Sequence, residues 1–276
     1  MRTQVGIVGA GPAGLLLAHL LRLRGIESVV VETRSREYVE NRIRAGVLEQ
    51  GTVDTLNESG VGERLRRQGL VHHGIELSFN GRRHRINLHE LTGGRAITVY
   101  GQTEVVKDLI TARLNAVAPL YFEVAETAID DFDTDLPKIR FHHQGEAQEI
   151  HCDFIAGCDG FHGICRAAIA ADRLQIFERT YPFGWLGILA ESKPPSKELI
   201  YCNHERGFAL FSMRTPEITR LYIQCEANDA LANWSDDRIW NELAARLDSG
   251  GDIELKEGRI LQRGITPMRS FVTEPM

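Results

Sequence analysis

Two adjoining runs of strand-like sequence carry side chains that could bind a ligand. Residues 207–224 are GFALFSMRTPEITRLYIQ, and the TPE triplet predicts a turn between two strands. Because side chains alternate along a strand, Ser212 and Arg214 share one face of the first run, and Arg220 and Tyr222 share one face of the second. A connection of odd length puts both pairs on the same face, with Ser212 near Tyr222 and Arg214 near Arg220.

Two arginines opposite one another repel unless something anionic lies between them. Arg214 and Arg220 therefore fit either of two situations. The face that they share is exposed to water, as one face of many antiparallel sheets is, or it is a binding site for an anion. The strands alone leave the choice open and do not identify the anion.

A second stretch, GAGPAG at residues 9–14, has the spacing G-x-G-x-x-G, follows a predicted strand and opens a predicted helix. In that position Gly9 permits a tight turn, Gly11 lets the backbone approach a pyrophosphate, and Gly14 lets helix and strand pack closely. The N–H groups at the helix start favour phosphate. Glu32 ends the next predicted strand, where a carboxylate binds the ribose hydroxyls of an adenosine. This arrangement predicts a dinucleotide site, without deciding between NAD and FAD.

The elements that would position these residues follow from periodicity and turn signals. We expect strands at 3–8, 28–32, near 120–127, 138–143 and 148–156 and through much of 180–226, helices at 13–24, 46–58, 103–117 and from Ser235 to about 247, and a hairpin at Asn80-Gly81. The pattern predicts one nucleotide-binding α/β region and one smaller, mostly antiparallel region.

The composition bounds the class of protein. The 276 residues are 43% hydrophobic and 25% charged, with a net charge of −6 and no basic block, so a globular protein is expected and nucleic acid is not expected as a partner. Five cysteines without a C-x-x-C pair argue against a disulfide framework and a zinc site. His142 and His143 are adjacent on a predicted strand and point to opposite faces, so no metal is expected. No segment resembles a membrane span or a signal peptide, and a cytoplasmic protein is expected.

After Glu32 the chain continues with an arginine-bearing segment, a hairpin and a meander, whereas an NAD dehydrogenase would keep alternating strands and helices. Segments spread over essentially all 276 residues resemble the flavoprotein aromatic hydroxylases that act on 4-hydroxybenzoate: GAGPAGLLL, RIRAGVLEQG, VYGQTEV, IAGCDGFHG, YPFGWLG, GFALFSMR and RLYIQ. The resemblance implies an α/β fold with a Rossmann-like FAD-binding domain at 1–175, an antiparallel substrate-binding sheet domain with one helix at 176–268, and a truncated return toward the FAD domain at 269–276.

The resemblance also implies cofactor contacts. For FAD these are Gly9, Ala10, Gly11, Pro12, Ala13, Gly14, Glu32, Arg42, Ile43, Arg44, Ala45, Gly46, Val47, Gln102, Asp159 and Arg220. Arg220 would face the flavin and stabilise its anionic reduced form. For the co-substrate NADPH, with NADH as the alternative, the implied contacts are Arg34, Arg36, His162 and Arg269.

The resemblance implies that the anion near Arg214 and Arg220 is the carboxylate of the substrate. The implied substrate contacts are Tyr201, Ser212, Met213, Arg214 and Tyr222. Arg214 would bind the carboxylate in bidentate fashion, with hydroxyl groups as further donors. Tyr201 would hydrogen-bond the phenolic oxygen, and His72 would end a relay that removes the phenolic proton.

The implied reaction converts 4-hydroxybenzoate into 3,4-dihydroxybenzoate (protocatechuate) with NADPH and O2, by way of a flavin C4a-hydroperoxide. The family continues beyond the final SFVTEPM into a second flavin-binding segment and a helical region used in dimerisation. We therefore expect either a partial sequence of an enzyme that is a homodimer at full length, or a truncated product. Three alternatives stay open. These are a related flavin hydroxylase of another phenolic acid, an inactive FAD-binding remnant and an NAD-dependent dehydrogenase.

Overall fold

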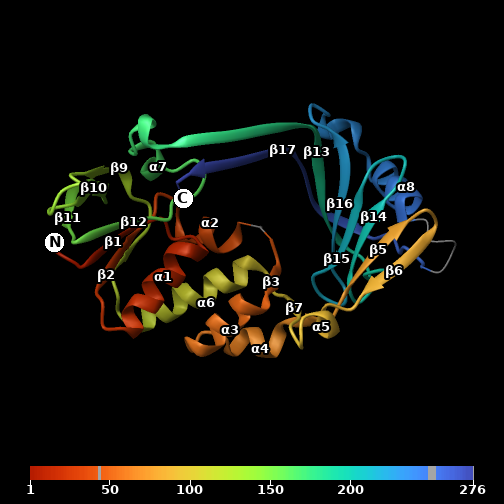
Figure 1. Ribbon diagram of the computed structural model, residues 1–276, viewed down its shortest axis with the longest axis horizontal. Helices are drawn as coiled ribbons and strands as arrows, with labels where there is room; N and C mark the ends of the chain where they lie inside the picture. The colour runs from red at the N-terminus through yellow and green to blue at the C-terminus, as the bar shows by residue number, and fades with distance from the viewer. Residues whose placement is uncertain (43–44, 248–252, 276) are drawn as a thin grey trace. The chain divides into compact units, whose positions relative to one another are not determined.

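A computed structural model of the chain describes residues 1–42, 45–247 and 253–275. The chain divides into two compact units (Figure 1). Unit 1 consists of Met1–Val47, Gly51–Gly69 and Tyr100–Leu174, and unit 2 of Leu48–Gln50, Leu70–Val99 and Gln175–Met276. The mixed α/β fold that the sequence predicted is confirmed.

Unit 1 is built on a four-stranded parallel sheet with the strand order β12-β1-β2-β8. Its strands are β1 (Val5–Val8), β2 (Ser28–Val31), β8 (Leu120–Tyr121) and β12 (Phe154–Gly157). Every residue of β1 and β2 is buried, as expected of central parallel strands that are covered on both faces.

One face of this sheet is covered by α1 (Pro12–Leu23) and α6 (Gln102–Asn115), and the other by a three-stranded meander (Figure 1). The meander strands are β9 (Ala125–Asp130), β10 (Lys138–His143) and β11 (Glu146–His151). Val8 and Val31 of the parallel sheet and Phe141 and Ile150 of the meander belong to one buried cluster. The meander therefore packs on the sheet through a hydrophobic layer.

The shorter helices of unit 1 are α2 (Arg36–Asn41), α3 (Gln50–Glu58), α4 (Glu63–Gln68) and α7 (Ile164–Ala167), with a 3-10 turn at Ala171–Arg173.

The predicted helix over 46–58 was wrong in its first turn. There the chain forms β3 (Val47–Glu49), which joins a small sheet with β7 (Ile97–Val99) and β4 (Leu70–His72). This pairing is with residues far along the chain, which outweighs local helical spacing. The strand expected over 148–156 is likewise two strands, β11 and β12.

Unit 2 contains a seven-stranded sheet with the order β17-β13-β16-β15-β14-β5-β6. Its strands are β5 (Ile75–Phe79), β6 (Arg82–Ile86), β13 (Gln175–Glu191), β14 (Leu199–Asn203), β15 (Ala209–Met213), β16 (Thr219–Glu226) and β17 (Arg259–Glu274). All neighbours are antiparallel except β14 and β5. The predicted Asn80-Gly81 hairpin is confirmed, and both residues have the positive φ that such a turn needs.

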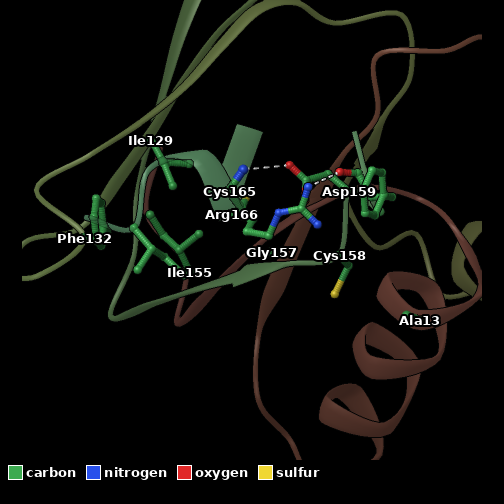
Figure 2. Close-up of a pocket in the computed structure, with 12 residues that line it drawn as sticks. Ala13, Ile129, Phe132, Ile155, Gly157, Cys158, Asp159, Cys165 and Arg166 are labelled. Atoms are coloured by element: carbon green, nitrogen blue, oxygen red, sulfur yellow. Dashed lines mark hydrogen bonds between the residues drawn. The ribbon is translucent and has the colours of Figure 1, made fainter. Parts of the chain in front are cut away.

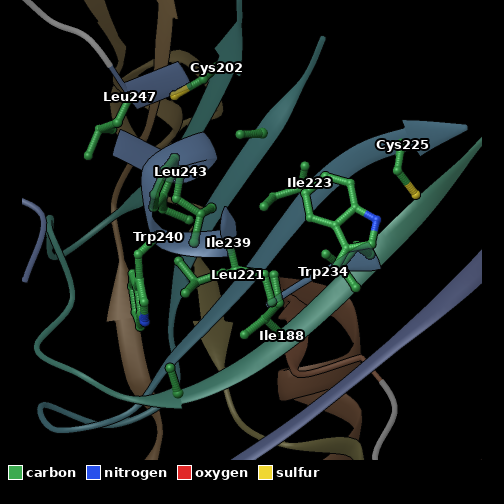
Figure 3. Packing of buried hydrophobic residues seen from close by; sticks show 14 of the residues in the cluster. Ile188, Cys202, Leu221, Ile223, Cys225, Trp234, Ile239, Trp240, Leu243 and Leu247 are labelled. Carbon is green, nitrogen blue, oxygen red and sulfur yellow. The ribbon is translucent and has the colours of Figure 1, made fainter. Parts of the chain in front are cut away.

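The helices of unit 2 are α5 (Leu88–Leu91), a 3-10 turn at Leu231–Asn233 and α8 (Asp236–Leu247). The predicted start of α8 is confirmed, because the Ser235 hydroxyl accepts a hydrogen bond from the N–H of Arg238. Ile239 and Leu243 of α8 pack against Leu221 and Ile223 of β16 (Figure 3). The core of unit 2 therefore lies between α8 and one face of the sheet.

The opposite face of the sheet carries the polar side chains of β15 and β16. Five residues, 214–218, connect the last ladder pair, so the two polar sets share a face as predicted. The residue directly opposite Ser212 is Arg220, and Tyr222 lies one pair further along on the same face. Met213 alternates to the other face, so its side chain does not join Ser212 and Arg220.

The two units differ from the continuous domains expected from the sequence. Residues 70–99, expected in the FAD-binding domain, belong to unit 2, because β5 pairs with β14. Residues 269–276, expected to return toward the FAD domain, also count with unit 2, because β17 pairs with β13 as far as Glu274.

Candidate active site

The glycine-rich loop of unit 1 connects β1 to α1 and is shaped by close backbone approaches. Gly9 has a φ of +106°, and a Cβ placed there would lie 2.4 Å from the carbonyl oxygen of Cys158. A Cβ on Gly14 would lie 2.1 Å from the carbonyl oxygen of Gly9. In contrast, a Cβ on Gly11 would meet no atom within 4 Å. The first and third glycines are therefore needed by the fold itself, while the second leaves open space.

Glu32 braces this loop from the end of β2. One carboxylate oxygen, Oε2, accepts a hydrogen bond from the N–H of Ala10 at 2.9 Å. The other, Oε1, accepts one from the N–H of Arg34 at 2.8 Å. Oε1 also accepts a hydrogen bond from the Thr33 hydroxyl at 3.3 Å. Oε2 has a second lone pair, which gives the acceptor capacity that a ribose hydroxyl needs.

A cavity of about 730 Å³ lies along the loop, and its lining includes Arg34 and Arg42. The guanidinium carbons of Arg34 and Arg42 lie 5.1 Å and 5.5 Å from the ring centre of Tyr38. Arg36 is turned to an ion pair with Glu40 at 2.7 Å. Arg34 and Arg42 thus line the cavity, and Tyr38 between them is a residue that the sequence reasoning missed.

Many of the other predicted cofactor residues of unit 1 line the same cavity, but its lining does not include Ala10, Gly14, Ala45, Gly46 and Val47. Its lining includes Gly9, Gly11, Pro12, Ala13, Glu32, Arg34, Arg42, Gln102, Asp159 and His162. The backbone N–H of Gln102 donates to the carbonyl of Ala45, and that of Tyr100 donates to the carbonyl of Gly46, so the segment ending at Val47 is tied to the start of α6. Ile43 and Arg44 lie outside the described residues.

A second cavity, also about 730 Å³, adjoins the first and shares Ala13, Cys158, Asp159 and Gly160 with it. Figure 2 shows its polar side, where Asp159 accepts a hydrogen bond from the N–H of Cys165 at 3.0 Å. The facing wall is apolar and includes Ile129, Phe132 and Ile155. Asp159 therefore fixes the start of α7 beside the nucleotide loop.

These features fit a dinucleotide such as FAD. The space beside Gly11 admits a pyrophosphate, and the start of α1 offers N–H donors and a positive partial charge. Arg34 and Arg42 add positive charge along the cavity. The donor set therefore suits an anionic, extended ligand.

In unit 2, Arg214 follows β15 on the polar face of the sheet. Its Nη1 atom is buried and, among the described residues, has no hydrogen-bond partner. Burial lowers the pKa of the guanidinium, and Arg220 lowers it further, while Tyr222 within hydrogen-bonding reach opposes both. Ser212 beside it is 3% exposed, and its hydroxyl donates to the Met213 carbonyl at 3.5 Å. The Nη1 atom of Arg214 is thus a buried donor without an acceptor in the described part of the chain.

Arg220 occupies the next position on this face. Its guanidinium carbon lies 4.9 Å from the ring centre of Tyr222, and its buried Nε also lacks a partner within the described part of the chain. The strand next to it provides Gly187, where a Cβ would lie 2.7 Å from Nη2 of Arg220. The structure brings Ser212, Arg214, Arg220 and Tyr222 together on one face.

An aromatic group borders these residues. The Phe208 ring centre lies 5.0 Å from that of Trp185 and 6.1 Å from that of Tyr201, and Trp185 lies 6.3 Å from Tyr222. Burial raises the pKa of the Tyr201 phenol. Trp185 and Phe208 were missed as site residues, although both belong to the segments on which the resemblance rests.

His72, at the end of β4, is 2% exposed, and neither ring nitrogen has a partner among the described residues. Burial lowers the pKa of the imidazole, Glu198 opposes this, and His73 adds to it. Glu198 is itself held by Arg85 through two contacts of 2.7 Å. A buried imidazole with two unsatisfied nitrogens is unusual in a purely structural role.

The four predicted nicotinamide contacts are not gathered in one unit. Arg34 and His162 line the unit 1 cavity, and Arg36 is paired with Glu40. Arg269 belongs to unit 2, where it forms an ion pair with Glu178 at 3.0 Å.

The parallel sheet of unit 1 and its glycine-rich loop are those of a dinucleotide-binding protein. A family model described as an FAD binding domain matches residues 2–276, and the chain belongs to this family. The chain is also 51% identical over all 276 residues to p-hydroxybenzoate hydroxylase of Acinetobacter baylyi, of which it covers 68%. The predicted resemblance and the predicted FAD-binding domain are confirmed.

Two further comparisons extend this result. A monooxygenase of Streptomyces rimosus, 12-dehydrotetracycline 5-monooxygenase/anhydrotetracycline 6-monooxygenase, is 30% identical over 188 residues, 62% of this chain and 33% of that protein. The crystal structure of p-nitrophenol 4-monooxygenase from Pseudomonas putida matches with a TM-score of 0.80 at 16% identity, over 99% of this chain and 70% of that one. At that identity the match establishes the fold alone.

Among the described residues there is neither a cluster of candidate metal ligands nor a membrane-spanning helix. No group of three or more His, Cys, Asp or Glu side chains there could hold a metal ion, and the five cysteines are free thiols. Within the same residues, each helix is too short or too polar to cross a membrane.

Proposed function

We propose that the chain carries the FAD and substrate sites of an aromatic hydroxylase that converts 4-hydroxybenzoate into 3,4-dihydroxybenzoate. The balanced reaction consumes NADPH, H⁺ and O2 and releases NADP⁺ and H2O. The family membership and the relative that is 51% identical support the reaction class. The observation that carries the choice of substrate is Arg214, whose buried Nη1 atom lacks a partner among the described residues, beside Ser212 and Tyr222.

The cofactor would be held in unit 1 by the loop Gly9–Gly14, Glu32, Arg42, Gln102 and Asp159. When bound, FAD supplies the redox chemistry that activates O2, and the chain's own residues bind, orient and tune. Gly11 would let the backbone approach the pyrophosphate, and Glu32, already fixed to the N–H of Ala10, would accept from the ribose.

Arg214 would recognise the substrate through its carboxylate. A buried charge without a partner costs about 3–5 kcal/mol, so a ligand that neutralises it regains much of that energy. The guanidinium fork matches a carboxylate with two parallel hydrogen bonds, and the Ser212 and Tyr222 hydroxyls add donors. A neutral phenol would leave Arg214 unpaired, so the site should prefer an acid.

Tyr201 and His72 would remove the phenolic proton of the substrate. A phenolate is more electron-rich than a phenol, and hydroxylation by an electrophilic oxygen requires an electron-rich ring. The Tyr201 phenol has its pKa raised by burial, so it stays protonated and can donate to the phenolate oxygen. His72, largely neutral because burial lowers its pKa, would accept the departing proton.

The nicotinamide co-substrate is proposed to be NADPH. Arg34 lines the unit 1 cavity, and its guanidinium stacks on the Tyr38 ring, which leaves its charge available for a 2′-phosphate. Arg36 is a weaker candidate, because Glu40 already neutralises it.

Product analysis of the purified, FAD-loaded protein tests the function. With 4-hydroxybenzoate, NADPH and ¹⁸O2 we expect 3,4-dihydroxybenzoate with one labelled oxygen, and Arg214→Ala should retain FAD but lose the product. A panel of hydroxybenzoates run in parallel separates the proposal from a related hydroxylase of another phenolic acid. Labelled product from a different acid only, or an Arg214→Ala variant with unchanged KM, would contradict the proposal.

A further inference from the structure

Gly187 is a buried glycine in the interior of β13, where a glycine needs a reason. In a strand it weakens the fold by roughly 0.5–1 kcal/mol relative to alanine, and it often marks a close approach of another group. Its φ lies outside the left-handed region, so the backbone conformation does not demand glycine. The register of β13 shifts elsewhere, between Thr180 and Gly184 and between Leu189 and Ala190, so no bulge explains it.

The reason lies on the polar face of the sheet. Gly187 pairs with Tyr222, and Leu189 pairs with Arg220. The Arg220 side chain turns back over the Tyr222 ring, which places its guanidinium above Gly187. A Cβ at Gly187 would lie 2.7 Å from Nη2 of Arg220 and 3.4 Å from Cε1 of Tyr222. The space of one missing methyl group is thus occupied by the guanidinium.

We propose that Gly187 is a positioning residue for substrate recognition, which keeps the Arg220 guanidinium over Tyr222 and beside Arg214. This inference rests on the proposed function, since it concerns the same anion site. Two positive charges on one face favour a carboxylate more than one does, and the second charge counts only where it is held close. Any side chain at 187 would push the Arg220 guanidinium off the Tyr222 ring, because its end is the flexible part of the contact.

The chain offers a matched control at the paired position of the neighbouring strand. Gly264 of β17 is the direct ladder partner of Gly187, and a Cβ there would meet no atom within 4 Å. Gly187→Ala and Gly264→Ala therefore add the same methyl group to neighbouring strands, and only the first reaches Arg220. Calorimetric titration of the FAD-loaded protein with 4-hydroxybenzoate compares them. We expect about a tenfold higher Kd for Gly187→Ala, and a change below about twofold for Gly264→Ala.

A double-mutant cycle with Arg220→Ala shows whether Gly187 acts through that arginine. Once the guanidinium is removed, a methyl group added at position 187 has room, so Gly187→Ala should change the Kd of the Arg220→Ala protein by less than about twofold. If Gly187→Ala alone folds poorly, the double variant still tests the proposal, because without the Arg220 guanidinium the added methyl group meets no clash. Thermal unfolding of the unaltered protein and every variant reports on folding separately.

Three results would overturn the inference. Equal Kd values for Gly187→Ala and Gly264→Ala would show that substrate binding does not depend on the space that Gly187 leaves for the Arg220 guanidinium. A full Gly187→Ala effect in the Arg220→Ala background would place the effect elsewhere, and a normal Kd in Arg220→Ala itself would remove the arginine from recognition. Each of these leaves hydroxylation by the unaltered protein intact. A failure of the proposed function would instead appear as absent binding or absent product in the unaltered protein.

Discussion

The two units build their binding sites from different parts of the chain. In unit 1 the nucleotide loop is a backbone structure, in which Gly9 and Gly14 fit against carbonyl oxygens and Glu32 accepts from the N–H of Ala10. In unit 2 the site is a set of side chains on a sheet, with Arg214 and Arg220 both holding a buried donor atom that lacks a partner among the described residues.

Because of this difference, substitutions in the two units should affect protein stability and ligand binding in different proportions. A backbone loop is part of the fold, so changes to it should affect folding and ligand together. An arginine with an unsatisfied, buried donor works against stability, and such a residue persists where a ligand completes it. Residues of unit 1 and unit 2 should therefore respond differently to substitution, and variants of each unit test that difference.

The largest effect is expected in the glycine loop. Gly9→Ala places a methyl group 2.4 Å from a backbone oxygen at a φ of +106°, so we expect unfolding at lower temperature and FAD affinity reduced by about 100-fold or more. Gly11→Ala is the matched variant. It meets no protein atom, so it should keep the stability of the apoprotein and lose FAD affinity alone. Fluorescence titration with FAD and thermal unfolding measure both, and normal FAD binding by Gly11→Ala would contradict the placement of the pyrophosphate.

The next largest effect concerns proton removal in unit 2. Tyr201→Phe should retain FAD and bind 4-hydroxybenzoate within about threefold, but form product at least about 100-fold more slowly, the size of a general acid–base contribution. NADPH consumption should then exceed product formation. Parallel assays of NADPH consumption and product formation test this prediction, with Tyr121→Phe of unit 1 as the control. One product per NADPH in Tyr201→Phe would exclude the relay.

A smaller effect is expected for the co-substrate. Arg34→Gln should raise the KM for NADPH several-fold, on the order of 1 kcal/mol for one partly exposed charge contact. Arg36→Gln should change it less than about twofold, because Glu40 already pairs with that guanidinium. Steady-state rates at fixed 4-hydroxybenzoate provide the comparison. Equal effects of the two substitutions, or an equal effect on NADH, would argue against a 2′-phosphate contact at Arg34.

The smallest effect is a pH dependence of stability from His72. Burial lowers the pKa of its imidazole below the ordinary value of 6.5, although Glu198 opposes this and His73 adds to it. The unfolded chain therefore takes up the proton first. Stability from this group is complete above pH 6.5 and is lost as the pH falls through that value toward the folded pKa.

His72→Asn should accordingly lose less stability than the unaltered protein between about pH 7.5 and about pH 5.5, by about 1 kcal/mol or less. Urea unfolding at the two pH values measures it. His84→Asn, at a more exposed histidine on β6, is the control substitution. An unaltered pH dependence in His72→Asn would mean that the imidazole is not held neutral.

The same contrast explains what the sequence could predict. The loop of unit 1 depends on a local order of glycines between one strand and one helix, and that order is visible in a single short stretch of sequence. The shared face of Ser212 and Arg220 was also predictable, because it follows from strand alternation and the parity of one short connection. The exact pairing of Ser212 with Arg220 was not, since it depends on the ladder register.

Features that depend on distant pairing were missed. Where β3 forms, the sequence predicts the first turn of a helix, because the partner strand β7 lies far along the chain, at Ile97–Val99. Gly187 gave no signal, because its role depends on Arg220 in another strand. Tyr38 could be predicted only in part. Its spacing of four from Arg34 and Arg42 is visible in the sequence, but only the structure shows both guanidinium groups against its ring.

The most direct test of the account compares 4-hydroxybenzoate with its neutral analogue 4-hydroxybenzamide, in the unaltered protein and in Arg214→Met, both loaded with FAD. We predict that the unaltered protein binds the acid about 100-fold more tightly than the amide. Arg214→Met should lose this preference while its melting temperature stays equal or rises, because an unsatisfied buried charge is removed. A preference for the acid that survives in Arg214→Met would contradict the assignment of Arg214 as the carboxylate site.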